Sequence, residues 1–451
     1  MLRILYLFLL IPLLWSYWKV LQRLRGERLA LTPILGWMAG LGYFLVAPLT
    51  LLVLNGGYTI PPFYDANSSY ASLDLSNGRY FLPMLVVWLA LLFSFQAVMI
   101  LTPEPGKDKL NHELPINEQK LKRILFVTFG LALVDYAVTI RVLGGLESFL
   151  AAHWYYRQDE MFTRFGDAYV LYARLSQANS IVFTAAAAIY TSRQLQRRRM
   201  EWGWSALIVF ALLLQMVMSG NRIFIALYGL SFLVSCWFYR RKRPIFLLLA
   251  LSPAILLLFS AWSYFRHDLT TIAEDIPTYT EADLGNRVMT TLMDTTEGVS
   301  VVQVFHIVND FGRKFDYFYG LTYSKAVTFV LPRSLYPNKP QNFPVLIAKL
   351  YEPGEVTSFG TTQLGELYAN FGPFSVLVLP FITVLILLLS GKLARKYEEH
   401  SLVSAALFVL LIWYARSSFE DNFVTFLLAL LLIWGLKLER GLCVPNQPEL
   451  A

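Results

Sequence analysis

Charged residues are scarce in this chain of 451 residues. Asp, Glu, Lys and Arg together make up 15% of it, whereas hydrophobic residues make up 56%. Because a soluble globular domain carries about 25% charged residues, the composition excludes a soluble protein and predicts a membrane protein with many spans. The net charge of +7 does not require a nucleic-acid partner, since the basic residues gather in short loops between the apolar runs.

Cysteines and metal-binding patterns are also scarce. Cys236 and Cys443 are the two cysteines, and both lie near predicted cytoplasmic loops, so no disulfide is expected on the outer side. The five histidines are scattered and no Asp-x-Asp sequence occurs. We therefore expect no metal site and no cofactor.

Apolar runs long enough to cross about 30 Å of hydrocarbon recur along the chain. They predict an all-α polytopic membrane protein with about eleven transmembrane helices. The first run lacks the small-residue cleavage site of a signal peptide, so we expect it to be a retained helix. The runs cover residues 2–18, 30–54, 81–101, 124–143, 168–192, 203–220, 222–239, 245–262, 373–391, 402–416 and 422–436.

Lys and Arg residues cluster in every second connection between these runs. Because basic loops stay on the cytoplasmic side, the N-terminus is predicted to lie outside and the C-terminus in the cytoplasm. The chain then divides into residues 1–262 with about eight helices, a large outer loop at 263–372, and residues 373–451 with about three helices and a cytoplasmic tail.

The long outer segment from Trp262 to Gly372 is polar and rich in arginine and aromatic residues. Anchoring alone would not need it, so we expect an anionic ligand to bind or react there. Apolar residues at helical spacing between 284 and 312 predict an amphipathic helix, whereas three prolines within 332–340 exclude a regular helix. Another outer connection, 55–80, is rich in Gly, Pro, Asn and Ser and is predicted to be an irregular loop.

Arginines near the outer ends of the predicted helices are candidates for binding a diphosphate. A guanidinium carries a planar donor fork that suits a phosphate held bidentately, and a charge at membrane depth is costly unless it is paired, snorkelling or functional. For Arg416, the alternative is an ion pair, because Glu420 follows one helical turn later. The candidates are Arg222, Arg266, Arg333 and Arg416.

Three short motifs lie at predicted outer positions. They are Gly-x-Arg at 220–222, Pro-x-x-Leu-Tyr-Pro-x-Lys-Pro at 332–340, and Gly-Glu-Leu-Tyr-x-Asn-Phe-Gly at 365–372. Together with the topology, they resemble the Wzy-type oligosaccharide repeat unit polymerases, which are the O-antigen and capsule polymerases. The topology match covers nearly the whole chain, whereas the residue match covers only these three runs.

The resemblance implies a GT-C-like fold in the bacterial inner membrane, with a large periplasmic loop that contains short helices. It implies a metal-independent membrane glycosyltransferase whose donor and acceptor are both undecaprenyl-diphosphate-linked glycans. Such an enzyme transfers the growing glycan to the non-reducing end of an incoming unit, releases undecaprenyl diphosphate and builds a surface polysaccharide such as that of lipopolysaccharide. The expected partners are the lipid bilayer and, in the same pathway, a chain-length regulator and a flippase.

The acceptor hydroxyl needs a base, and a carboxylate beside the membrane surface can serve. Glu366 is the predicted base, and its alternative role is to cap or pair at the start of the ninth span. His267 and Asp268 are the next candidates for the catalytic role. The residues expected to bind glycan are Tyr336, Lys339, Gln363, Tyr368 and Asn370.

Two other functions stay open on the sequence. An O-antigen ligase, which is another glycosyltransferase for lipid-linked sugars, would place a histidine before the equivalent last span, and this chain has none between 350 and 372. A polysaccharide flippase or other transporter would more often show internal repeats and helices broken in mid-membrane, whereas here the charge lies at one face. The sequence therefore favours a polymerase.

Overall fold

The computed structural model describes residues 2–25, 31–58, 72–102, 117–151, 161, 164–165, 167–199, 201–219, 223–239, 298–329, 335–336, 338–351, 361–396, 401–438 and 442. These residues are mostly helical, which confirms the predicted class of an all-α membrane protein. Within them, five helical segments are long and apolar enough to cross a membrane. These segments are Leu2–Leu24, Pro33–Asn55, Gly78–Leu101, Glu118–Val142 and Gln363–Leu393.

Shorter apolar helices cover Trp202–Met218, Ile223–Phe238 and Leu402–Tyr414. Every predicted apolar run overlaps a helix except 245–262, which lies outside the described residues. The total of about eleven spans therefore stays a prediction, because it rests on counting apolar runs that are long enough to cross a membrane at about 1.5 Å per residue.

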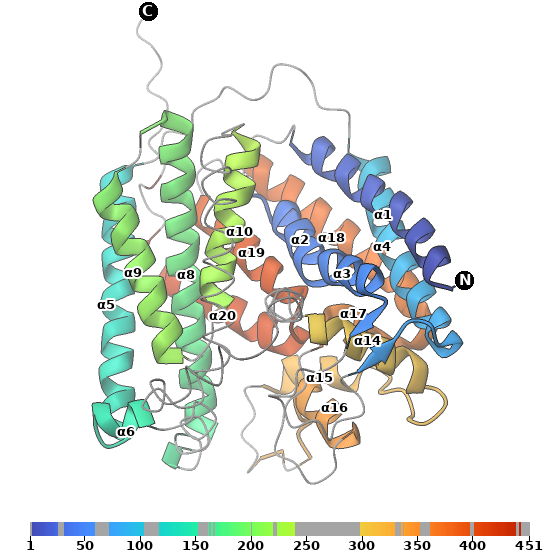
Figure 1. The fold of residues 1–451 in the computed structure, drawn as a ribbon. Helices are drawn as coiled ribbons and strands as arrows, with labels where there is room; N and C mark the ends of the chain where they lie inside the picture. The colour runs from blue at the N-terminus through green and yellow to red at the C-terminus, as the bar shows by residue number, and fades with distance from the viewer. Residues whose placement is uncertain are drawn as a thin grey trace, which may run out of the picture.

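The N-terminal part of the chain forms helices that run alternately up and down through the molecule (Figure 1). In chain order, the elements are α1 (Leu2–Leu24), α2 (Pro33–Leu41), a π-helical turn η1 (Gly42–Val46), α3 (Ala47–Asn55), β1 (Gly57–Tyr58), β2 (Leu73–Asp74), a 3₁₀ turn η2 (Gly78–Tyr80), α4 (Phe81–Leu101), α5 (Glu118–Val142), α6 (Leu146–Ala151), α8 (Asp167–Arg197), α9 (Trp202–Ser219) and α10 (Ile223–Phe238).

The C-terminal part combines short helices with three longer ones. In chain order, they are α14 (Gly298–Asp310), α15 (Leu321–Thr328), α16 (Phe343–Tyr351), α17 (Gln363–Phe371), a 3₁₀ turn η4 (Gly372–Phe374), α18 (Ser375–Lys396), α19 (Ser401–Tyr414) and α20 (Phe419–Gly435). The amphipathic helix predicted within 284–312 is present as α14, and residues 284–297 lie outside the described part.

Part of the predicted irregular loop at 55–80 is ordered more regularly than expected. Gly57 and Tyr58 pair antiparallel with Asp74 and Leu73. The chain enters this pair through Gly56, whose φ of 82° is a left-handed conformation that glycine adopts at little cost at the end of a helix. Residues 59–71 lie outside the described part.

Close backbone approach joins distant parts of the sequence in the core. Helix α2 packs against α19, and a Cβ at Gly40 would lie 2.7 Å from the carbonyl oxygen of Ile412. Gly36, one turn earlier, faces the backbone of Phe408 in the same way. Small residues four apart allow helices in membranes to pack this closely. The first and last thirds of the chain therefore share one core.

The two ends of the bundle differ in what they carry. Helix α6 and, to its right, helices α15 and α16 all lie at the end that is lower in Figure 1, which we call the cluster end. Helix α5 runs from the opposite end, which we call the basic end, down to α6. The basic end includes residues 117–123 of α5 and residues 436–438 after α20.

Candidate functional site

Helix α17 forms the centre of the candidate site. It is a short helix, separate from the long α18 that follows it. Gly372 ends it with a φ of 58° and a ψ of −141°, which breaks the helix before the 3₁₀ turn η4. A Cβ at Gly365 would lie 3.3 Å from side-chain atoms of Val304 and Ile307, so the glycine allows α17 to lie close against α14. The polar contacts of α17 are made by Glu366 and Asn370, which are one helical turn apart and therefore lie on the same face.

The Glu366 carboxylate connects three helices. Its side chain is 1% exposed. Thr322 of α15 donates to Oε1 over 2.8 Å, and the backbone N–H of Phe419 donates to Oε2 over 2.8 Å. Phe419 begins α20, and the hydroxyl of Ser418, the residue before it, makes no capping hydrogen bond. Glu366 therefore caps α20 rather than its own helix, where its negative charge also favours the helix dipole.

Asn370 completes the same network. Its Nδ2 donates to Thr322 Oγ1 over 2.9 Å, and its Oδ1 accepts from the backbone N–H of Gly320 over 3.0 Å. Gly320, with a φ of 88°, immediately precedes α15. Because Asn370 also donates to the Glu366 carbonyl oxygen over 2.8 Å, its side chain has one available orientation. The start of α15 is thus fixed onto one face of α17.

Charged pairs lie beside this network on the neighbouring turns. Lys325, one turn after Thr322 on α15, places its Nζ 3.4 Å from Oε2 of Glu420. Arg174 of α8 forms an ion pair and hydrogen bond with Asp421, and Asn342 donates to the same Asp421 oxygen over 3.4 Å. We call Arg174, Thr322, Lys325, Glu366, Asn370, Glu420 and Asp421 the polar cluster.

Burial makes the charges of the polar cluster interdependent. The side chains of Lys325 and Glu420 are 10% and 4% exposed, and burial lowers the pKa of Lys325 against the opposing pull of Glu420 and Asp421. A buried ion pair that loses one partner leaves a costly unpaired charge. We therefore expect the pairs of the polar cluster to tolerate substitution poorly.

Arg416 lies in the turn between α19 and α20. It follows α19, and its backbone N–H donates to Trp413 over 2.9 Å. The backbone N–H of Gln363, at the start of α17, donates to the carbonyl oxygen of Ala415 over 3.1 Å. Glu420, the partner that the sequence suggested for Arg416, lies 3.4 Å from Lys325 Nζ.

Several buried polar atoms at the starts of α17 and α20 have no hydrogen-bond partner within the described part of the chain. In native proteins, most buried polar atoms are hydrogen-bonded to protein or water, so such a group requires an explanation. Their side chains are at most 4% exposed. These atoms are Thr362 Oγ1, Gln363 Oε1, Ser418 Oγ and Asn422 Oδ1. They can accept hydrogen bonds from water or from the hydroxyls of a ligand.

The predicted glycan-binding residues separate into two groups. Gln363, Tyr368 and Asn370 are buried, and Gln363 donates to the Tyr323 hydroxyl over 3.1 Å. Tyr336 is exposed, and Lys339 donates to the carbonyl oxygen of Phe329 over 2.8 Å. The structure therefore joins Asn370 to Glu366 directly, whereas the Tyr368 ring lies against Tyr317. Tyr336 and Lys339 lie earlier in the polar segment, before α16.

Some predicted residues lie outside the described part of the chain. They are Arg222, Arg266, His267, Asp268 and Arg333. Within the described part, no three His, Cys, Asp or Glu side chains are grouped so that they could hold a metal ion.

Sequence reasoning missed Arg174, Lys325 and Asn342 as neighbours of Asp421 and Glu420. For Arg174 a signal existed, because it is an arginine inside a predicted span, where an ionisable residue is a candidate for a functional or paired role. Lys325 and Asn342 gave no such signal, since they lie in the long polar segment. Lys325 reaches the polar cluster through the packing of α15 against α20, and Asn342, just before α16, through its hydrogen bond to Asp421.

Comparisons of the chain with protein-family models, with curated proteins and with solved structures find no match. The fold and the candidate site define a helical membrane protein with a buried polar cluster at one end. Its resemblance to the repeat unit polymerases rests on the three sequence motifs and the topology.

Proposed function

We propose that this protein is a membrane glycosyltransferase that polymerises undecaprenyl-diphosphate-linked oligosaccharide repeat units into a surface polysaccharide. The observation that carries the proposal is the arrangement of Glu366 and Asn370, the two polar residues of the third motif. Both lie at the joint of α15, α17 and α20, where they hold Thr322 from two sides. A motif that anchored a helix in lipid would not need a buried carboxylate at this joint.

The proposed reaction joins two lipid-linked glycans. An acceptor hydroxyl oxygen attacks the anomeric carbon of the donor glycan, and the bond from that carbon to the diphosphate oxygen breaks. The bonding electron pair leaves with undecaprenyl diphosphate, and the hydroxyl proton passes to a carboxylate. Positive charge fixed beside the departing diphosphate favours this step, and Arg416, with Arg222, Arg266 and Arg333, is proposed to supply it.

Glu366 is the proposed base. Its Oε1 already accepts a hydroxyl hydrogen bond of 2.8 Å from Thr322, a distance suited to proton transfer between a hydroxyl and a base. In this proposal the acceptor hydroxyl replaces Thr322 on Oε1 while Oε2 keeps the Phe419 N–H. His267 and Asp268 stay the next candidates.

Polar acceptors around Glu366 are suited to sugar hydroxyls. Thr362 and Gln363 carry buried oxygens without a partner in the described part of the chain, on the first turn of α17. Tyr368 and Asn370, with Tyr336 and Lys339 on the polar segment, are proposed to extend the glycan-binding surface.

A glycan ladder tests the proposal. Membranes that contain the protein and an undecaprenyl-diphosphate-linked repeat unit should produce a ladder of products with rising numbers of repeats. A single addition to lipid A core would indicate a ligase instead, and translocation without a longer product would indicate a transporter. The control is the same membrane preparation without the protein.

The proposed location is a bacterial inner membrane, with about eleven GT-C-like spans, the segment 263–372 in the periplasm and the C-terminus in the cytoplasm. Cysteine labelling tests the sides. In a variant with Cys236 and Cys443 replaced by alanine, Tyr336→Cys should react with an impermeant thiol reagent from outside, because Tyr336 is exposed. Gln119→Cys, which is exposed at the basic end, should not react in intact cells, and labelling of both would contradict this topology.

A further inference from the structure

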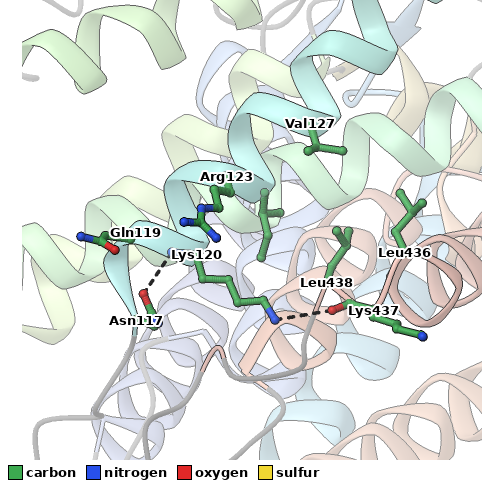
Figure 2. A pocket seen from close by; sticks show the side chains of 9 residues that line it. Asn117, Gln119, Lys120, Arg123, Val127, Leu436, Lys437 and Leu438 are labelled. Carbon is green, nitrogen blue, oxygen red and sulfur yellow. Dashed lines mark hydrogen bonds between the residues drawn. The ribbon is translucent and has the colours of Figure 1, made fainter.

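A groove of about 270 Å³ lies at the basic end, between the start of α5 and the end of α20. Figure 2 shows its side chains: Asn117, Gln119, Lys120 and Arg123 lie along the start of α5, whereas Lys437 lies beside Leu436 and Leu438 after α20. It lies at the opposite end of α5 from α6, and so away from the polar cluster (Figure 1). The proposed glycosyl transfer does not use it.

The described residues that line the groove include three cations and no carboxylate. The cations are Lys120, Arg123 and Lys437. Lys120 is partly committed, because its Nζ lies 3.5 Å from the carbonyl oxygen of Lys437. Arg123 and Lys437 are exposed, and neither side chain forms a hydrogen bond or ion pair with another described residue. Within the described part of the chain, the charges of Arg123 and Lys437 are therefore not neutralised.

Nearby basic residues outside the groove are neutralised. Lys122 places its Nζ 2.6 Å from Glu201, and Arg197 forms an ion pair with Glu118. The contrast is informative because Lys122 and Arg123 are adjacent in sequence. Among the described residues, Glu118 and Glu201 are committed to pairs beside the groove, which leaves Arg123 and Lys437 attractive to an anion.

The backbone adds to this preference. Asn117 caps the start of α5 by accepting from the Lys120 N–H over 3.0 Å. Asn117, Gln119 and Lys120 all line the groove, so it lies at the positive end of a helix of 25 residues. The dipole acts in the same direction as the three cations.

The rest of the groove is apolar. Ile124 and Leu438 are buried in it, whereas Val127 and Leu436 are exposed, with 42% and 47% of their surface accessible. Ile124 and Val127 follow Arg123 along α5, which is long and apolar enough to cross a membrane. A cationic site that continues along an apolar helix suits a ligand with a phosphate and an acyl chain. A free phosphate would contact only the cationic part of the site.

We propose that this groove binds an anionic phospholipid, with the headgroup phosphate between Arg123, Lys437 and Lys120 and an acyl chain along Ile124 and Val127. Basic pockets between membrane helices are suited to anionic headgroups, because each cation near the anionic surface contributes about 1 kcal/mol. The groove is a lipid site separate from the proposed diphosphate site at the cluster end. Its occupant is a resident of the bilayer and is not consumed.

Native mass spectrometry of the full-length protein tests the proposal. The protein in detergent is titrated with phosphatidylglycerol and, separately, with phosphatidylcholine. We expect tighter binding of phosphatidylglycerol, and roughly 30-fold weaker binding of it in the double variant Arg123→Gln, Lys437→Gln. That factor follows from two contributions of about 1 kcal/mol each, at about 1.4 kcal/mol per tenfold change.

The matched control is the double variant Lys122→Gln, Arg197→Gln. It removes the same charge from the same end but leaves the groove intact, so it should bind phosphatidylglycerol within about threefold of the unchanged protein. Equal weakening in both double variants would overturn the proposal, because it would indicate attraction by net charge alone. Equal binding of phosphatidylcholine would also overturn it.

A competition experiment separates a lipid from a soluble anion. Inorganic phosphate at the concentration of the bound phosphatidylglycerol should not displace it, because free phosphate lacks contacts with Ile124 and Val127. Displacement by phosphate would assign the groove to a soluble anion and overturn the lipid proposal. The unfolding temperature of both double variants without lipid shows whether they are folded. It should equal that of the unchanged protein in the groove variant, since Arg123 and Lys437 are exposed. In the control variant it should decrease slightly, because two partly exposed ion pairs are lost.

Discussion

The cluster end and the basic end of the bundle use charge in opposite ways. At the cluster end, the side chains of the Arg174–Asp421 pair are 11% and 17% exposed, and the pair adjoins the hydrogen bonds of Glu366. At the basic end, the Arg197–Glu118 pair is 41% and 27% exposed. The first set of charges is part of the packing between helices, whereas the second stays partly exposed at the surface.

The difference shows why a count of charges does not locate a site. Exposed ion pairs contribute little to stability because water screens them, and their loss leaves the chain folded. A largely buried pair fixes the relative position of the two helices that carry it, because each buried charge is costly without its partner. The comparison predicts that equal substitutions at the two ends have unequal effects.

The largest effect is expected for Glu366→Gln. If Glu366 takes the proton from the acceptor hydroxyl, the amide removes the basic lone pair and turnover falls by roughly 100-fold to 10,000-fold. Donor binding should barely change. The measurement is repeat-unit consumption together with donor binding in one purified preparation.

The matched variant for this prediction is Thr322→Val, which removes the hydroxyl that Glu366 Oε1 accepts. Turnover should stay within about tenfold, because in the proposed reaction the acceptor hydroxyl takes this position. An equal loss in both variants would assign the pair a structural role. Full turnover in Glu366→Gln would move the base to His267 or Asp268.

The next effect concerns stability at the cluster end. Asp421→Asn leaves Arg174 largely buried beside an uncharged amide, so the free energy of unfolding should fall by about 3 kcal/mol. Thermal unfolding in detergent measures it. A change within the error of the measurement would mean that water enters and screens this pair.

The corresponding substitution at the basic end should have a smaller effect. Glu118→Gln removes the partner of Arg197, whose side chain is 41% exposed, and the free energy of unfolding should fall by at most about 1 kcal/mol. The same thermal measurement compares it with Asp421→Asn. If Glu118→Gln proves as costly as Asp421→Asn, the two ends do not differ as proposed.

The smallest effect is a dependence of stability on pH, which arises from His306 on α14. Burial lowers the pKa of His306 below its ordinary value of 6.5, and its Nε2 lies 3.3 Å from the carbonyl oxygen of Ser72. Below about pH 6.5, the histidine therefore binds more protons in the unfolded chain than in the folded one. This stability is present above about pH 6.5 and is lost as the pH falls through the folded pKa.

The unfolding temperature should therefore decrease between about pH 7 and pH 5 by more in the unchanged protein than in His306→Gln. Glutamine retains an N–H donor for Ser72 and does not titrate. Parallel curves for the two proteins would show that His306 does not contribute to the pH dependence.

The sequence alone determined the class of the protein and the positions of its helices. Apolar runs of sufficient length predict helices whatever their neighbours, because backbone groups in lipid must satisfy their own hydrogen bonds. The predicted runs accordingly overlap helices wherever the structure describes them, from α1 at Leu2–Leu24 to α20 at Phe419–Gly435. The motif at 365–372 also directed attention to Glu366.

Only the tertiary structure decided which residues meet. Glu366 was predicted as a base or as a cap of its own segment, and it caps α20 through Phe419, 53 positions later in the chain. Arg174 meets Asp421 across 247 positions. No periodicity in the sequence encodes such a partner, because helix packing depends on side-chain shape across both surfaces. The local patterns set each helix, and the packing of α8, α15, α17 and α20 set the polar cluster.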